Sequence, residues 1–125
     1  YVLTMEPTGS LWDTGEFISS AYKLQIPHPP GAPLFILMGR LFTLFTPGDA
    51  AIGVNLLSAL ASGLTILFLF WTITHFARRL VQKNHEELTG PQVFNVMAAG
   101  VIGSLAYTFS DSFWFSAVEG EVYAL

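Results

Sequence analysis

The sequence contains no cysteine and few charged residues, which make up 11% of its 125 residues. The absence of cysteine excludes disulfides and thiolate metal sites, and it leaves the cellular compartment open. An ordinary soluble domain has about 25% charged residues, so a chain that is 52% hydrophobic indicates a membrane protein. Five Lys and Arg against nine Asp and Glu give a net charge of -4 and no basic patch, which excludes a nucleic-acid-binding surface.

Signals at the two ends of the chain are also missing. The first residues have neither a basic stretch nor a small-residue cleavage site, so no signal peptide is visible. The chain begins at Tyr1 and stops at Leu125 without a polar tail, which predicts a fragment of a longer polytopic protein. We interpret residues 1–5 as the end of a preceding transmembrane helix.

Two long runs without formal charge predict membrane spans. The run from Ala50 to Thr74 would extend about 37 Å as a helix, against a hydrocarbon core of about 30 Å. Within the second run, residues 93–109 would reach about 25 Å, and Gly90-Pro91 marks the start. We therefore assign transmembrane helices to 50–76 and 92–109. The first run also contains small residues that favour close helix packing, namely Gly53, Ser58, Ala59, Ala61, Ser62 and Gly63. The predicted fold is an all-α, polytopic helical bundle.

The segment between the spans sets the predicted orientation. Arg78, Arg79 and Lys83 lie in it, and short loops rich in Lys and Arg stay cytoplasmic. We assign residues 77–91 to the cytoplasm, 6–49 to a first extracytoplasmic loop, and 110–125 to the start of a second. One periplasmic or luminal side then holds six carboxylates: Asp13, Glu16, Asp49, Asp111, Glu119 and Glu121.

Residues 33–46, PLFILMGRLFTLFT, allow two interpretations. As a span they would reach only about 20 Å and would place Arg40 in mid-bilayer, at a cost of roughly 3 kcal/mol or more. We therefore predict a juxtamembrane helix with Pro33 in its first turn. Arg40 can then reach lipid head groups or a bound anion.

The stretch WDTGEFISSAYKLQIPHPPG, residues 12–31, places two carboxylates and a histidine close together. A capping box, of Ser10 with Asp13 or of Asp13 with Glu16, would explain the acidic residues without any chemistry. Alternatively, Asp13, Glu16 and Ser20 form one polar helix face for a substrate. His28 lies on a connector that the flanking prolines keep out of a helix. It is either a polar connector residue or a ligand or base, and no HExxH spacing indicates a metal site.

A second acidic stretch, residues 111–121, follows the second predicted span. Its aromatic residues Phe113, Trp114 and Phe115 are typical of an interfacial belt, and the alternative is stacking on a sugar. Glu119 and Glu121 are separated by Gly120. Carboxylates at bilayer level call for a partner, a cation or a role in function.

Together these blocks resemble a known family. W-D-T-G-E-F, then H-P-P and an apolar helix, is similar to the first outer loop of GT-C glycosyltransferases such as protein O-mannosyltransferases and aminoarabinose transferases. The whole chain resembles a multi-pass family related to vertebrate O-mannosyltransferases, through W-D-x-G-E-F, H-P-P-G-A-P and F-W-F-x-A-V-E-G-E-V-Y blocks. The resemblance implies a GT-C-like enzyme that transfers a mannose-like sugar, with inversion, from a polyprenyl- or dolichyl-phosphate carrier. The acceptor is a hydroxyl of a protein, on Ser or Thr, or of a glycan.

The resemblance also implies roles for individual residues. Asp13 matches the acidic residue that deprotonates the acceptor, while Thr14 stands where the family has an adjacent Glu. Glu16 stands nearby, and acceptor binding, cation binding and helix capping all remain open for it. The basic candidates for the carrier phosphate are His28, Arg40 and Lys23, and Arg40 is favoured because arginine binds phosphate through two hydrogen bonds.

A divalent cation remains open as a cofactor. Glu119 and Glu121 resemble the acidic pair that oligosaccharyltransferases use for a cation, although mannosyltransferases of this class are not thought to need a metal.

Two other classes of protein compete with the enzyme. An ion-coupled secondary transporter would place carboxylates inside its spans, whereas both predicted spans lack formal charge. A non-catalytic membrane assembly subunit would tolerate replacement of Asp13, Glu16 and Glu119.

Overall fold

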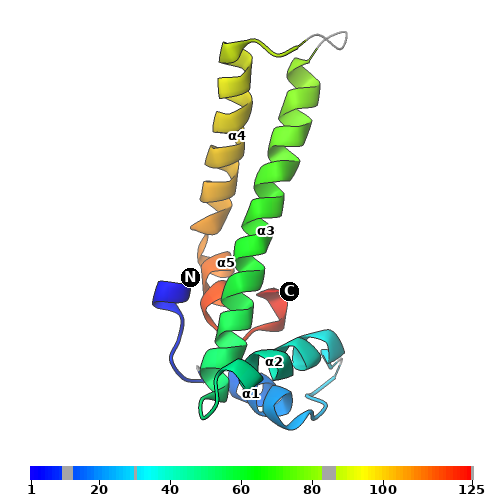
Figure 1. Ribbon diagram of the computed structural model, residues 1–125, viewed down its shortest axis with the longest axis vertical. Helices are drawn as coiled ribbons and strands as arrows, with labels where there is room; N and C mark the ends of the chain where they lie inside the picture. The colour runs from blue at the N-terminus through cyan, green and yellow to red at the C-terminus, as the bar shows by residue number, and fades with distance from the viewer. Residues whose placement is uncertain (10–12, 30, 83–86, 125) are drawn as a thin grey trace. The chain divides into compact units, whose positions relative to one another are not determined.

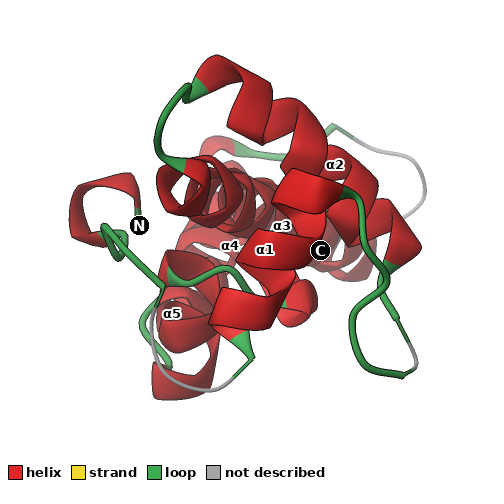
Figure 2. Cartoon of the chain, turned by 90° about the horizontal axis from the view of Figure 1, so that it is seen from below, coloured by secondary structure: helices red, strands yellow, loops and turns green. Residues whose placement is uncertain are grey.

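The computed structural model describes residues 1–9, 13–29, 31–82 and 87–124. These residues form helices and loops, with no strand among them, so the all-helical prediction is confirmed for this part of the chain (Figures 1 and 2). Residues 1–63 and 111–125 form one compact unit, and residues 64–110 form a second. In chain order the elements are η1 (Val2–Thr4), α1 (Thr14–Lys23), α2 (Pro33–Phe45), α3 (Ala50–Val81), α4 (Gly90–Thr108), α5 (Asp111–Val118) and η2 (Val122–Ala124).

Helix α1 begins at Thr14 without the predicted capping box. Asp13 is the N-cap residue, but its side chain makes no capping hydrogen bond. The capping interpretation of Asp13 with Glu16 is therefore wrong, because the Glu16 carboxylate bonds elsewhere. The alternative cap, Ser10, lies outside the described residues. At the other end, Leu24 adopts a left-handed conformation and its N–H donates to the Ser20 carbonyl.

Prolines keep the segment after α1 out of a helix and start the next helix, as predicted. The described residues between α1 and α2 are not helical, and Pro33 occupies the first turn of α2. The core of the first unit joins these two helices to the start of α3, through Phe17, Ala21, Ala32, Phe35, Ile36, Val54 and Leu57. Gly39 permits this packing, because a Cβ there would lie 2.9 Å from the Ala21 Cβ.

Asn55 ties the beginning of the chain to α3. It is fully buried, and its side-chain amide donates to the backbone carbonyls of Glu6, at 2.7 Å, and Thr8, at 3.2 Å. The turn after α5 packs on the same place, since a Cβ on Gly120 would lie 3.0 Å from Asn55 Oδ1 and 3.1 Å from Val54 Cγ1. Both ends of the first unit therefore pack against the early turns of α3.

The aromatic residues of α5 differ from the predicted belt. Phe113 is buried and meets the Tyr1 ring edge-on, with centroids 6.0 Å apart, and Trp114 meets Tyr1 at 5.0 Å. The belt interpretation is therefore wrong for Phe113, which belongs to the packing of the first unit. Phe115 remains 63% exposed.

By length and composition, α3 is long and apolar enough to span a membrane, and α4 qualifies only if it is taken together with α5 as one broken span. Only 22% of the most apolar stretch of α3 is buried. Its exposed large side chains include Leu64, Leu67, Phe68, Trp71 and Phe76. A helix with so much exposed apolar surface is suited to lipid.

The helix boundaries depart slightly from the predicted spans. Helix α3 continues to Val81, and α4 starts at Gly90 behind a capping box in which the Gln92 side chain accepts the Thr89 N–H. Within the second unit, α3 and α4 lie side by side (Figure 1). A Cβ on Gly100 would lie 2.8 Å from the Phe70 ring, so this glycine allows close approach of the two helices.

Candidate active site

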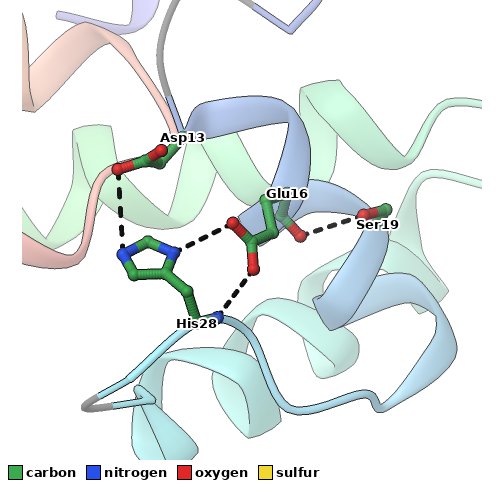
Figure 3. A network of polar contacts seen from close by, with 4 residues as sticks. All are labelled: Asp13, Glu16, Ser19 and His28. Carbon is green, nitrogen blue, oxygen red and sulfur yellow. Dashed lines mark hydrogen bonds and ion pairs between the residues drawn. The ribbon is translucent and has the colours of Figure 1, made fainter.

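Asp13, Glu16 and His28 converge at the start of α1 (Figure 3). Glu16 binds His28 twice: Oε1 accepts the backbone N–H at 2.7 Å, and Oε2 lies 2.9 Å from the ring Nδ1. The other ring nitrogen, Nε2, lies 3.8 Å from Asp13 Oδ2. The imidazole is thus held between two carboxylates, each facing a different nitrogen.

The surrounding chain holds this imidazole in place. The Phe17 ring lies 5.8 Å from it and packs edge-on against Phe35 at 5.7 Å. Pro27 and Pro29 flank His28 and stiffen the connector. His28 is therefore a polar residue of the connector, which was the first of the two alternatives that the sequence allowed. It also belongs to a cluster with two carboxylates.

Each member of the Glu16–His28 pair shifts the other's pKa. The hydrogen bond from His28 lowers the pKa of the Glu16 carboxyl, and the hydrogen bond to Glu16 raises the pKa of the His28 imidazole. Both shifts favour a carboxylate paired with an imidazolium. The side chains are 41% and 46% exposed, so solvent screens the pair and its contribution to stability is small.

A cavity of about 150 Å³ opens beside this cluster. Its lining comes from α1, the connector and the chain after α5: Asp13, Phe17, His28, Gly31, Glu121, Val122 and Tyr123. Burial raises the pKa of the Glu121 carboxyl, and the negative charges of Glu119 and Asp13 raise it further. The structure thus brings Asp13, His28 and Glu121 to one cavity, although more than 90 residues separate the last two in sequence.

The remaining predicted residues lie elsewhere in the first unit. Glu119 is outside the described lining of the cavity, although its charge acts on Glu121. Arg40 donates from Nη1 to the Tyr22 carbonyl at 2.8 Å, and its guanidinium lies 5.3 Å from the centre of the Tyr22 ring. This arginine therefore joins α2 to α1. Lys23 is exposed in the last turn of α1, also outside the described lining.

The cluster offers the donor types of a metal site, but its hydrogen bonds oppose one. Asp13, Glu16 and His28 each present one donor atom, all within 4.8 Å of one another. However, both Glu16 oxygens are engaged by His28, and a raised histidine pKa favours the protonated ring, which cannot bind a metal. Of Glu119 and Glu121, only the latter belongs to the described lining. In this arrangement the Glu16 carboxylate is already engaged by His28, and no chemical step is assigned to a metal ion.

A larger apolar cavity, of about 490 Å³, adjoins the first along the connector. Its lining is mostly aliphatic: Leu24, Gln25, Ile26, Pro27, Gly31, Ala32, Pro33, Ile36 and Leu37. Gly31 lines both cavities and adopts a positive φ of 74°, a conformation that favours glycine. The connector thus carries a polar cavity and an apolar one that meet at a single residue.

Sequence reasoning did not anticipate Phe17, Gly31 and Tyr123 as lining residues. Gly31 could have been suspected, because a glycine after two prolines is a common site of left-handed backbone. The signal for Phe17 was weaker: it follows Glu16 directly in an amphipathic helix, which places it next to a candidate site residue. Tyr123 is the last residue of the E-G-E-V-Y block, but the block does not place it in the lining, because its position depends on how the chain folds back after α5.

Comparison with known proteins supplies a family. The family model described as "Protein O-mannosyl-transferase TMEM260 N-terminal domain" matches residues 13–125. A mouse protein named Protein O-mannosyl-transferase TMEM260 is 33% identical over 126 positions, covering 100% of this chain and 16% of the mouse protein. A Dictyostelium discoideum protein named Protein O-mannosyl-transferase tmem260 is 27% identical over 128 positions, covering 100% of this chain and 14% of that protein. The chain thus spans less than a fifth of the length of these relatives. No solved structure matches it.

Proposed function

Because this chain belongs to the TMEM260 N-terminal domain family of protein O-mannosyl-transferases, we propose that it carries the reacting end of an enzyme that mannosylates protein hydroxyls. The donor in this proposal is mannose on a polyprenyl or dolichyl phosphate, the acceptor is a Ser or Thr side chain, and the whole enzyme has the GT-C arrangement. The observation that carries it is the cavity in which Asp13, His28 and Glu121 meet.

Asp13 accepts the proton of the acceptor in this mechanism. A hydroxyl is a poor nucleophile at neutral pH, so a carboxylate must take its proton as its oxygen attacks the anomeric carbon. The new carbon–oxygen bond forms on the face opposite the leaving group, and the bond from that carbon to the phosphate oxygen breaks. The lipid phosphate leaves with the electron pair, and the configuration inverts. Asp13 lines the cavity and its side chain is 60% exposed, so an acceptor can reach it.

We assign His28 to the departing phosphate and Glu16 to positioning His28. Because the base and the leaving phosphate lie on opposite faces of the sugar, this assignment requires the 3.8 Å contact between His28 Nε2 and Asp13 Oδ2 to open when the substrates bind. The raised pKa keeps the imidazole in its cationic form over a wider pH range, and a cation stabilises the negative charge that develops on the phosphate. Arg40, which sequence reasoning favoured for this role, is bonded to the Tyr22 carbonyl and lies outside the described lining. His28 is therefore the better candidate. Glu16, which binds both its backbone and its ring, is a positioning residue.

Glu121 contributes a carboxyl that is more readily protonated than usual. A protonated carboxyl can donate a hydrogen bond to a sugar hydroxyl, which an ionised one cannot do. We assign Glu121 to binding the sugar. Glu119 acts on it through its charge and does not line the described cavity.

The apolar cavity beside the connector supports a lipid-linked donor. Its exposed aliphatic side chains, among them Ile26 at 92% and Leu37 at 58% exposure, suit the first isoprene units of the carrier. The charged phosphates of a nucleotide would find one polar side chain, Gln25, and no charged one among the described lining residues. Since Gly31 lines both cavities, a carrier lying in the apolar one would bring its phosphate to the edge of the polar one.

The side of the membrane follows from the basic segment around Arg78 and Arg79. We propose that this segment is cytoplasmic, as its charge predicts, and that both acidic stretches lie on the luminal or periplasmic side. The transporter alternative gains no support from α3 up to Thr74 or from α4, which contain no formally charged residue.

The donor assignment can be tested with the purified full-length protein in lipid nanodiscs. Given a Ser/Thr-containing acceptor domain, it should transfer mannose from polyprenyl-phosphate mannose and not from a nucleotide-linked mannose. Mass spectrometry of the acceptor, with the Asp13→Asn protein as the blank, measures the product. Transfer from the nucleotide sugar without any lipid carrier would contradict the proposal.

Glu16→Gln should shift the pH profile of transfer. Glu16 raises the His28 pKa above its ordinary value of 6.5, so the cationic ring persists to a higher pH in the wild type. The amide removes that effect, and the alkaline fall in kcat should move to lower pH, towards 6.5. Glu6→Gln, at a residue that uses its backbone in the contacts described above, is the control and should leave the profile in place. An unchanged pH profile in Glu16→Gln would contradict the claim that Glu16 supports transfer by raising the pKa of His28.

A further inference from the structure

A second cavity, of about 710 Å³, lies within the second unit, between the last turns of α3 and the start of α4. It falls within the 300–1,000 Å³ of most small-molecule sites. Trp71, His75 and Arg78 follow one another at helical spacing on one face of α3, and all three line the cavity. Val93 and Met97 face them from α4 at the same spacing. The mechanism proposed above uses none of these residues.

The lining has two chemically different parts. Arg78 and His75 lie towards the end of α3 where charged residues begin, Glu87 also lines this end of the cavity, and all three residues are exposed. Trp71 and Met97 lie towards the charge-free part, whereas Val93, in the first turn of α4, lies level with Arg78. Each of these three residues is between 45% and 55% exposed. A charged end that carries both Arg78 and Glu87, together with an apolar end, matches a ligand with a phosphate and an ammonium group at one end and carbon chains at the other.

We propose that this cavity binds a membrane phospholipid such as phosphatidylethanolamine, with Arg78 on the phosphate, Glu87 on the ammonium group, and Trp71 and Met97 on the first carbons of the acyl chains. Arginine recognises phosphate through two parallel hydrogen bonds, and tryptophan favours the level of the lipid head groups. Basic pockets between membrane helices are a known way of holding such head groups. Free phosphate shares the anionic chemistry but would leave the apolar half of the lining without a contact.

The neighbouring arginine provides a matched control. Arg79 has the same charge and lies one residue further along α3, but it is outside the described lining of the cavity. General attraction of a basic segment to anionic membranes would depend on both arginines alike. A built site depends on Arg78 alone.

The test is native mass spectrometry of the full-length protein released from vesicles of phosphatidylethanolamine and phosphatidylglycerol. The wild type and Arg79→Gln should retain a bound phospholipid, and Arg78→Gln should retain about tenfold less, as expected for loss of a charge-assisted hydrogen bond. Met97→Trp, which fills the apolar half and leaves Arg78 intact, should lose the lipid as well. Size-exclusion chromatography of each variant confirms that it is folded.

Three outcomes would overturn the proposal. Equal retention by the wild type and Arg78→Gln would show that the arginine holds no phosphate. Equal loss in Arg78→Gln and Arg79→Gln would reduce the effect to general charge. Displacement of the retained lipid by inorganic phosphate alone, or thermal stabilisation of the delipidated protein by it, would make this a site for free phosphate. Mannosyl transfer is not the readout, so failure here leaves the proposed function standing.

Discussion

Replacing Asp13 by asparagine is expected to lower kcat of mannosyl transfer by the full-length protein by about 10²- to 10⁴-fold, the range for loss of a general base. The amide has nearly the shape of the carboxylate but cannot accept the acceptor's proton. It keeps an oxygen that can face His28 Nε2, so the fold of the first unit should survive. Binding of the lipid-linked donor should change little, because Asp13 acts on the acceptor.

Asp49→Asn is the matched control for this substitution. Asp49 is also exposed, and its side chain accepts the Ile52 N–H at the start of α3. Asparagine can accept the same bond, so both stability and transfer should stay close to the wild type. If Asp13→Asn retained wild-type transfer, Asp13 would not be the base, and Glu121 would be the carboxyl in the cavity to examine next.

Replacing His28 by glutamine should give the second largest loss, about 10²- to 10³-fold in kcat, the range for removal of one group that stabilises developing charge. Glutamine can still donate a hydrogen bond but carries no positive charge for the leaving phosphate. A donor with a better leaving group than an alkyl phosphate should recover part of the loss. Single-turnover transfer with both donors would measure this.

Arg40→Gln distinguishes the two candidates for the phosphate. Its bond to the Tyr22 carbonyl links α2 to α1, so the substitution should lower thermal stability and leave kcat within a few-fold of the wild type. Loss of transfer in Arg40→Gln together with normal transfer in His28→Gln would show that Arg40 binds the leaving phosphate, as the sequence alone favoured.

The helices were the most predictable part of this chain. The charge-free run Ala50–Thr74 identifies α3, because a backbone buried in lipid must form a helix. Gly90-Pro91 and Pro33 mark helix starts, because proline lacks the backbone N–H that the first turn of a helix leaves unpaired. The length of α3 beyond the predicted span was not foreseen. Helices can continue past the hydrocarbon core, and the charges at Arg78 and Arg79 do not stop them.

The partners of the polar residues were much less predictable. Spacing alone favoured a cap for Glu16, whereas its carboxylate binds a histidine 12 residues away, on a connector whose path depends on the packing of Phe17 against Phe35. The sequence alone did not show a partner for Arg40. In the fold, its guanidinium donates a hydrogen bond to a backbone carbonyl of α1. Such contacts are decided by tertiary packing, which local spacing does not contain.

The position of Glu121 shows the same limit. It reaches the cavity because Gly120 lets the turn after α5 approach Asn55 and Val54 closely. A lone amide inside an apolar run was a visible signal for Asn55, since a buried polar group needs partners. Which segments would supply those partners, residues Glu6 and Thr8, could not be deduced from the sequence.

The central claim is that residues from both ends of this chain build one cavity outside the cytosol. Single-cysteine labelling with a membrane-impermeant maleimide tests it in the full-length protein, in sealed vesicles of known orientation and on a background without other cysteines. Lys23→Cys and Tyr123→Cys, both exposed, should react from the luminal or periplasmic side, and Arg79→Cys only after the membrane is permeabilised. Labelling of Lys23→Cys and Tyr123→Cys from opposite sides would contradict the account.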